Sequence, residues 1–493
     1  MIAEVILLIV TLVLLHHLFH RYTEPSNLPP GPRPYPLIGN LPLLIGSFSS
    51  LHVKFTELAK TYGSVYTLYL NGQRSVVVGS AKALHEGLVE RKDAIAGRPY
   101  SFSMEYGCKG CKNVGFADFS PFLLFKRRVV HSSLRQYYPQ VEDKVNHQLD
   151  KVLTEIKALD GTAFDPHYLI SLVTLNVMSS ITFGTNYTLD DPEFLRLVLM
   201  NDTFGQCFGA FNILDMFPFL LHFPIKASKM LKYLATDRYD YLMEQARKHE
   251  DAYDDNTIRD LTDGLIKSLS EAEKGGSDIH SLVTTEDLAM IIGDMVVAGS
   301  ETSATTMRWM LAYLTVYPEV QARLHQQLDD VIGRDKNTII TLKDRGRLPY
   351  VEAVIAETLR VSPPTPFLLP HKATRDTTLD GYFIPKDTTV IFNIWKIQND
   401  PAEWADPHVF NPARFLDEDG KFVNNKNLLP FGAGRRVCVG EKVATMELFL
   451  MTSRLLRHLE FKPLSDGPPP SLEGTYGVVY YPMPYKIRAL ERL

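Results

Sequence analysis

Hydrophobic and polar positions along the chain predict a mainly α-helical protein with small β-sheets. Apolar residues recur at helical spacing through most of the sequence after residue 50, whereas the alternation typical of strands is confined to short pieces at 65–70, 75–78 and 388–392. The longest helical segment, 288–316, is apolar on nearly all sides and contains only three charged side chains. Because three charges are costly in hydrocarbon, we predict a buried central helix there instead of a membrane span.

A second apolar run, at the start of the chain, predicts a membrane anchor. Residues 1–19 contain only three ionisable side chains, and the run is close to the ~20 residues that span a bilayer. No basic region precedes the run and no small-residue cleavage site follows it, so we expect a retained transmembrane helix over 1–21 instead of a cleaved signal. Glu4 lies before the apolar centre while Arg21 and Arg33 lie after it, which places the remainder of the chain in the cytosol.

Composition and spacing indicate one large domain after the anchor. Residues 22–49 are rich in proline, which fixes φ and removes backbone donors, so we predict a semi-rigid hinge. No Gly/Ser linker or charge block divides residues 50–493, which are therefore expected to form a single catalytic domain. The net charge of −5 gives no reason to expect a nucleic-acid partner, and four cysteines in 493 residues argue against a disulfide framework.

The glycine-rich segment 431–440 contains the cysteine with the most specific setting, Cys438. It leads into a segment with helical periodicity, and the positive end of a helix stabilises a thiolate, which is the form of cysteine that binds iron. Glycines without a Cβ would let a flat macrocycle approach the backbone, and Arg436 would neutralise one of its carboxylates. A cysteine in such a loop is more often structural, so both interpretations stay open on these residues alone.

The motif F-x-x-G-x-R-x-C-x-G over 431–440 resembles the cysteine loop of the cytochrome P-450 superfamily. The segment E-T-L-R at 357–360 resembles the family's E-x-x-R helix, and Arg414 lies in a segment similar to the one whose arginine joins that pair. This resemblance extends from the proline-rich hinge to the C-terminus. It implies the cytochrome P-450 fold, a heme b cofactor whose iron is held by the Cys438 thiolate, and a buried Glu-Arg-Arg network that shapes the thiolate side.

The resemblance also implies a monooxygenase, in which one atom of dioxygen enters the substrate and the other leaves as water. Glu301 and Thr302, inside the long apolar helix, match the family's proton-delivering acid and alcohol, although such a pair alone is weak evidence. The small residues Ala298 and Gly299 are expected to leave room for dioxygen where the helix crosses the cofactor.

Three basic side chains are implied as contacts of the heme propionates. Arg127 matches the arginine of a W-x-x-x-R pattern, although the tryptophan position is Leu123, and His371 lies where many members have an Arg or His. Arg436, in the cysteine loop, is the third. The alternative interpretation of Arg127 is a solvated basic cluster.

Electrons are expected to come from an NADPH-dependent cytochrome reductase, with cytochrome b5 as a further candidate partner. Lys126, Arg128, Arg435 and Lys442 are expected near Cys438, where a basic surface would speed the approach of an acidic reductase; an ordinary solvated surface is the alternative. Together with the anchor, the resemblance implies a single-pass protein of the endoplasmic reticulum membrane with its catalytic domain in the cytosol.

The substrate pocket is predicted to be apolar. Phe204 and Phe208 recur at helical spacing in the region that roofs the pocket in the family, although such a stripe is also typical of an ordinary core. An apolar pocket favours a lipophilic substrate. By resemblance, the expected pocket residues are Phe116, Cys207, Phe208, Ala298, Thr365, Val478 and Val479.

Short segments leave two substrate classes open. Residues 298–302 and 470–474 resemble the steroid 17-alpha-hydroxylase/17,20-lyase group, whereas 256–260 and 375–379 resemble the neighbouring aryl-hydrocarbon-oxidising group. Cys207 falls where the steroid hydroxylases carry an asparagine that hydrogen-bonds the steroid, so steroid hydroxylation and xenobiotic or aryl-hydrocarbon oxidation remain alternatives. The intact motifs disfavour an isomerase or dehydratase and a heme or sterol binding protein without turnover. Whether C–C cleavage follows hydroxylation stays open.

Overall fold

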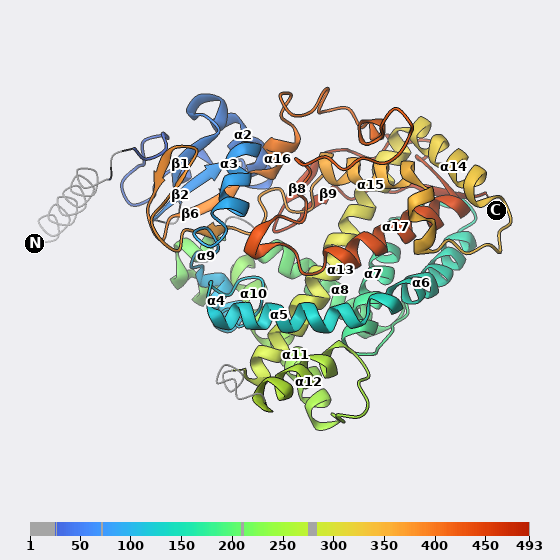
Figure 1. Cartoon of the computed structure of the whole chain (residues 1–493), viewed down its shortest axis with the longest axis horizontal. Coiled ribbons are helices and arrows are strands. Elements are labelled where there is room, and N and C mark those ends of the chain that lie inside the picture. Colours follow the sequence, from blue (N-terminus) through green and yellow to red (C-terminus); the bar gives the residue numbers. More distant parts are fainter. Residues whose placement is uncertain (1–24, 26, 71, 209–211, 275–282, 493) are drawn as a thin grey trace, which may run out of the picture.

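The structure is a computed structural model that describes residues 25, 27–70, 72–208, 212–274 and 283–492 (Figure 1). Helices account for most of the described chain. Its α-helices are α2 (Leu51–Tyr62), α3 (Ala81–His85), α4 (Phe102–Gly107), α5 (Pro121–Gln136), α6 (Tyr138–Ala158), α7 (His167–Thr182), α8 (Pro192–Cys207), α9 (Ile213–Met216), α10 (Lys226–Tyr233), α11 (Tyr239–Asp251), α12 (Leu261–Lys274), α13 (Thr285–Val316), α14 (Pro318–Ile332), α15 (Pro349–Val361), α16 (Ile394–Gln398) and α17 (Glu441–His458).

Small sheets occupy one side of the molecule and the C-terminal region. The largest has the order β1-β2-β6-β3, with β2 parallel to β6 and the other neighbours antiparallel. Three two-stranded sheets pair β4 with β5, β7 with β10 and β8 with β9. The strands are β1 (Val65–Leu70), β2 (Gln73–Val78), β3 (His371–Lys372), β4 (Thr377–Leu379), β5 (Tyr382–Ile384), β6 (Thr389–Phe392), β7 (Leu459–Lys462), β8 (Gly474–Tyr476), β9 (Tyr480–Pro482) and β10 (Arg488–Glu491). The three predicted strand segments are confirmed as β1, β2 and β6.

The long apolar segment forms α13, which passes through the centre of the fold, as predicted (Figure 1). It packs against α7, α11, α15 and α17, so residues on nearly every side of it are buried. Its start is fixed by a capping box, in which the Asp287 carboxylate accepts hydrogen bonds from the backbone N–H and hydroxyl of Thr284.

The same Asp287 carboxylate binds Lys126 of α5. The Lys126 ammonium lies 3.2 Å from Asp287 Oδ1, its side chain is only 3% exposed, and it also donates to the Lys112 carbonyl. The expectation that Lys126 belongs to a basic docking surface is therefore wrong, because a carboxylate distant in sequence pairs with it inside the fold.

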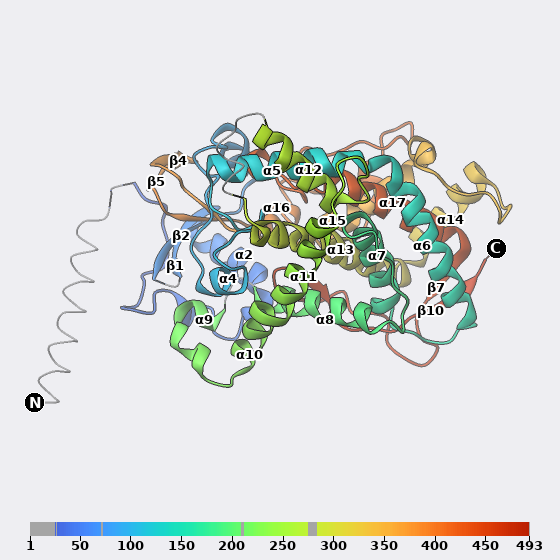
Figure 2. The same cartoon turned by 90° about the horizontal axis from the view of Figure 1, so that it is seen from below.

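The helices form layers on both sides of α13. Figure 2 shows α5 and α12 on one side of α13 and α8 and α10 on the other. The architecture predicted from the sequence, mainly helical with small sheets, is confirmed.

The predicted transmembrane helix over 1–21 lies outside the described residues. Among the residues that the structure does describe, none forms a helix long and apolar enough to cross a membrane. Part of the proline-rich segment lies along β1, where the Thr67 N–H donates to the Pro30 carbonyl at 2.8 Å and the Tyr69 N–H to Asn40 Oδ1 at 2.8 Å.

Candidate active site

One cavity brings together most of the site residues expected from the sequence. The cysteine loop, α13, the segment between α15 and β3, and the turn between β8 and β9 all contribute to its wall. The expected residues that line it are Arg127, His371, Arg436, Cys438, Glu301, Thr302, Phe116, Ala298, Thr365, Val478 and Val479. Cys207 and Phe208 do not line it.

The loop before Cys438 is held by close backbone contacts. The Cys438 N–H donates to the Phe431 carbonyl at 3.0 Å, and α17 begins just beyond, at Glu441. Gly434 has φ of +70°, and a Cβ there would lie 1.8 Å from the Leu88 carbonyl oxygen, so only glycine fits. Burial raises the pKa of the Cys438 thiol, while the backbone N–H groups of Gly440 and Glu441 and the charge of Arg127 oppose that rise. Further positive charge at this position would favour the thiolate.

A cationic wall lies beside the cysteine. Arg127 donates to the Val437 carbonyl, and Arg436 donates to the carbonyls of Ala96 at 2.7 Å and Ala117 at 2.8 Å. The third N–H group of Arg436, at Nη1, is buried and has no hydrogen-bond partner among the described residues.

Arg98 belongs to the same wall and was missed in the sequence. It is 7% exposed and donates to the carbonyls of Gly115 and Pro370, both at 2.9 Å. The Asp118 carboxylate accepts a hydrogen bond from the Arg98 backbone N–H, but its other oxygen pairs with the Lys372 ammonium at 2.6 Å. A single arginine in a loop belongs to no sequence motif, so only the folded chain identifies Arg98 as part of this wall.

His371 completes this side of the cavity in its neutral form. Its Nδ1 lies 2.7 Å from the Ile95 carbonyl, and burial together with the charge of Arg98 lowers its pKa well below the usual range. Three guanidinium groups, one of them with an unused N–H, thus face the cavity with little compensating negative charge. This wall fits the carboxylates of a flat anionic cofactor such as heme.

A buried ion network supports the thiolate side, as the resemblance implied. Glu357 and Arg360 of α15 are 0% exposed and form two hydrogen bonds at 2.7 and 2.8 Å, and Arg414 Nε lies 3.1 Å from Glu357 Oε1. Arg360 also donates to the carbonyls of Gln398 and Pro407, both at 2.8 Å. The two arginines of this network therefore share one buried carboxylate.

Replacing Glu357 by alanine is expected to lower the free energy of unfolding by ~3 to 5 kcal/mol, because it leaves the buried Arg360 charge uncompensated. Chemical denaturation followed by circular dichroism measures the loss. Glu244→Ala, which removes one member of the exposed Glu244–Lys248 pair on α11, is the control and should change the free energy by less than ~1 kcal/mol. Equal losses in both variants would contradict a structural role for the buried network.

Glu301 and Thr302 lie on α13 and line the same cavity as the cysteine loop. Glu301 is 6% exposed, and burial, followed by the charge of Asp202, raises the pKa of its carboxyl to about 7. The Thr302 hydroxyl donates to the Ala298 carbonyl at 2.9 Å. At Gly299 the structure shows a reason other than room for dioxygen: a Cβ there would lie 2.8 Å from Met178 of α7.

Comparison with known proteins agrees with this geometry. The Cytochrome P450 family model matches residues 29–489. The chain belongs to the Cytochrome P450 family. It is therefore a monooxygenase, an oxidoreductase of a family whose cofactor is a heme bound through a cysteine thiolate.

Curated relatives of this P450 fall into two groups. It is 34% identical to the steroid 17-alpha-hydroxylase/17,20 lyase of Gallus gallus over 472 residues, covering 94% of this chain and 92% of the relative. It is 33% identical to Cytochrome P450 1B1 of Homo sapiens over 492 residues, covering 96% and 89%. It is 34% identical to Cytochrome P450 1A1 of Platichthys flesus over 452 residues, covering 88% and 85%. The chain thus resembles both groups implied by its sequence.

Aromatic rings and two further polar side chains also line the P450 cavity. Phe116 and Phe204 line it with ring centroids 6.3 Å apart. Asn201 and Asp294 also line it, and Asp294 accepts hydrogen bonds from the side chain of Asn113 and the N–H groups that follow it. Neither was expected to form part of the pocket.

Cys207 and Phe208 face a neighbouring apolar cluster. Both pack in a core that includes Leu214 and Leu231, and the Asn212 amide donates to the Cys207 carbonyl at 2.9 Å. The position matched to the steroid-binding asparagine therefore contributes no lining to the cavity, whereas Asn201, earlier on the same helix, does.

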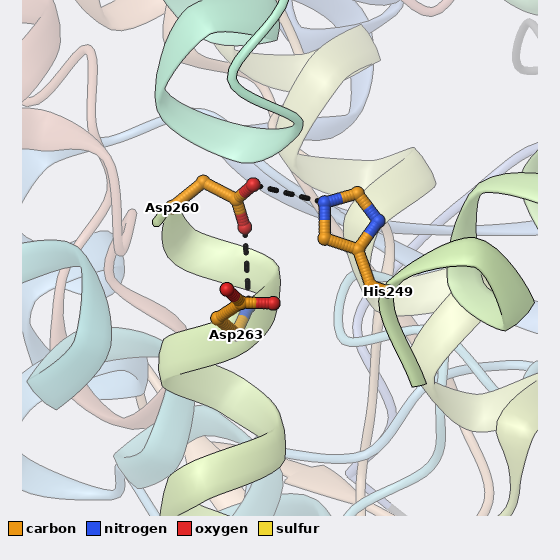
Figure 3. A group of neighbouring side chains, drawn as sticks. All are labelled: His249, Asp260 and Asp263. Atoms are coloured by element: carbon orange, nitrogen blue, oxygen red, sulfur yellow. Dashed lines mark hydrogen bonds and ion pairs between the residues drawn. The ribbon is translucent and has the colours of Figure 1, made fainter. Parts of the chain in front are cut away.

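A second titratable cluster lies between α11 and α12, outside the cavity (Figure 3). His249 Nε2 lies 2.9 Å from Asp260 Oδ2, and Arg259 binds both oxygens of Asp263 at 2.6 and 2.8 Å. The other ring nitrogen of His249 lies 2.8 Å from the Gln245 carbonyl. Because these atoms already have partners, we interpret the cluster as a junction between two helices and not as a metal site.

Proposed function

We propose that this P450 is an endoplasmic reticulum monooxygenase, anchored by residues 1–21 with residues 50–493 in the cytosol, that hydroxylates a lipophilic substrate. The observation that carries the proposal is that Cys438, the cationic wall, Glu301 and Thr302 all line one cavity. The apolar run at the start of the sequence supports the anchor.

In this proposal Cys438 would hold the heme iron, and Arg98, Arg127 and Arg436 would hold the propionates. His371, whose Nδ1–H is donated to the Ile95 carbonyl, would donate to a propionate through Nε2 when the propionate charge keeps its ring protonated. When bound, the heme activates dioxygen for insertion of one oxygen atom into the substrate. The chain itself supplies orientation, exclusion of water and protons. The apolar rings of Phe116 and Phe204 keep the substrate in a dry site.

Glu301 and Thr302 provide the protons that the reaction consumes. A carboxyl whose pKa is about 7 can hold a proton at neutral pH and release it to a neighbour, which is the property required of a general acid. The Thr302 hydroxyl, fixed toward Ala298 by its hydrogen bond, offers an oxygen that can accept one proton while donating another.

The electron donor in this proposal is an NADPH-dependent reductase that binds on the thiolate side, with cytochrome b5 as a second candidate. Arg128, Arg435 and Lys442 line an open pocket there, together with Cys438. Arg435 pairs with Asp93 at 2.6 Å, which leaves Arg128 and Lys442 as the better candidates for contact with acidic groups.

A spectral binding screen tests the substrate class. Steroids and planar aromatic hydrocarbons are titrated separately into the heme-loaded protein, and the class that shifts the Soret band at lower concentration is then incubated with NADPH and reductase. The steroid 17-alpha-hydroxylase/17,20 lyase relatives support a steroid, while the Phe116–Phe204 pair and the absence of Cys207 from the cavity wall support a planar aromatic. Binding without any NADPH-dependent product would contradict the proposed turnover.

A further inference from the structure

A polar cluster extends from Glu301 toward the surface. It joins Asp202 of α8, His167 at the start of α7, Arg308 of α13 and Tyr481 of β9. His167 Nε2 lies 3.7 Å from Asp202 Oδ1, and their side chains are 17% and 31% exposed. This end of the cluster therefore meets solvent, whereas Glu301 at the other end is buried beside the cavity.

The hairpin of β8 and β9 holds Tyr481 against α8, near Asp202. The Val478 N–H donates to the Gly205 carbonyl of α8 at 2.9 Å, and Trp309 of α13 donates to the Tyr480 carbonyl at 2.8 Å. Gly205 makes room for the ring, because a Cβ there would lie 1.8 Å from the Tyr481 hydroxyl oxygen. The hydroxyl is thus held against α8, within one turn of Asp202.

The Tyr481 hydroxyl is buried and has no hydrogen-bond partner within the described part of the chain. A buried polar group without a partner costs about 1 to 3 kcal/mol, so it calls for an explanation. A hydroxyl can accept and donate a proton at the same oxygen, which suits a relay between two carboxyls.

The charges in the cluster act on one another. Burial raises the pKa of Asp202 and Tyr481, and the negative charge of Asp202 adds to the effect of burial at Glu301. Arg308 opposes the rise at both carboxyls, while burial and Arg308 lower the pKa of His167 to about 4. His167 is thus neutral at pH 7. The positive charge of Arg308 acts on the pKa of both Asp202 and Glu301.

We propose that Asp202 and Tyr481 form the route by which protons from solvent reach Glu301. A proton from water binds the Asp202 carboxylate beside His167. The Tyr481 hydroxyl takes it on a lone pair and gives up its own hydrogen toward the Glu301 carboxylate. Water bridges each gap, because neither carboxyl lies within hydrogen-bond distance of this hydroxyl. Asp202 and Tyr481 end as they began, and one proton has moved inward.

This inference rests on the proposed role of Glu301. Asp202 and Tyr481 act through that carboxyl and not on the substrate, so they are positioning residues. The two variants that test them, Asp202→Asn and Tyr481→Phe, each change one polar group and keep the size of the side chain. They separate the charge of Asp202 from the relay through Tyr481.

The first measurement is an infrared pH titration of the full heme-loaded chain. The carboxylic acid C=O band of Glu301 is assigned by its loss in Glu301→Gln. Asp202→Asn removes a negative charge and is expected to lower the midpoint of that band by about one pH unit, whereas Tyr481→Phe should leave the midpoint in place. Glu193→Gln changes a partly exposed carboxyl of α8 that lies 3.8 Å from Arg196, and it should change nothing.

The second measurement is the rate at which the same band shifts after transfer into heavy water. Tyr481→Phe and Asp202→Asn are expected to slow the exchange by roughly tenfold or more, because both interrupt the route. Exchange at the wild-type rate in both variants would overturn the proposal. The coupling of NADPH use to product in Glu301→Gln separates this failure from failure of the proposed function, because it reports whether Glu301 delivers protons at all and not how they reach it.

Discussion

Replacing Cys438 by serine will abolish the red-shifted Soret band that the reduced protein shows with carbon monoxide. That band arises from thiolate ligation, and a serine hydroxyl is not deprotonated as readily as a thiol coordinated to a metal ion. The loss should be complete, because no other cysteine lines the main cavity. Absorption spectra of the dithionite-reduced protein with and without carbon monoxide provide the measurement.

Cys111→Ser is the matched control, since Cys111 is partly exposed and lies outside the cavity wall. Its band should equal that of the wild type. A normal band in Cys438→Ser would refute the assignment of the ligand, and a lost band in both variants would point to misfolding instead.

Replacing Thr302 by alanine will keep the heme but lower the rate of product formation by roughly a hundredfold, which is typical for loss of a proton-transfer group. Electrons from NADPH should then appear as hydrogen peroxide. The ratio of peroxide to NADPH consumed measures this diversion, with whichever substrate class the spectral screen identifies.

Thr315→Ala is the control for Thr302→Ala. Thr315 lies on the same helix and makes the same kind of bond, from its hydroxyl to the Leu311 carbonyl at 2.7 Å, but it does not line the cavity. Thr302→Ser restores a hydroxyl and should recover most of the coupling. Unchanged coupling in Thr302→Ala would remove Thr302 from the proton path.

Hydrophobic periodicity in the sequence predicted the helices and strands whose buried faces follow that periodicity. The central helix and the strands at 65–70, 75–78 and 388–392 appear close to their predicted bounds because periodicity and burial agree there. The motif around Cys438 could also be recognised in the sequence. The turn requires glycine at position 434 and the cysteine precedes the helix, so the spacing between these residues is fixed.

Contacts between distant segments could not be predicted in the same way. Lys126 looks like part of a solvated basic run, but its partner Asp287 lies 161 residues further along the chain. Arg98 stands alone in a loop, and only the fold brings it to the cavity beside Arg436. Cys207 was matched by its position in the sequence, and position alone does not tell which face of α8 lines the cavity.

The double use of Asp287 makes two distant positions depend on each other. Its carboxylate fixes the start of α13 and at the same time neutralises Lys126, whose neighbour Arg127 contacts the cysteine loop. A descendant protein that lost the Asp287 carboxylate first would bury the Lys126 ammonium without a partner until position 126 also changed. Positions 126 and 287 should therefore drift as a pair over evolutionary time, although most of the chain separates them.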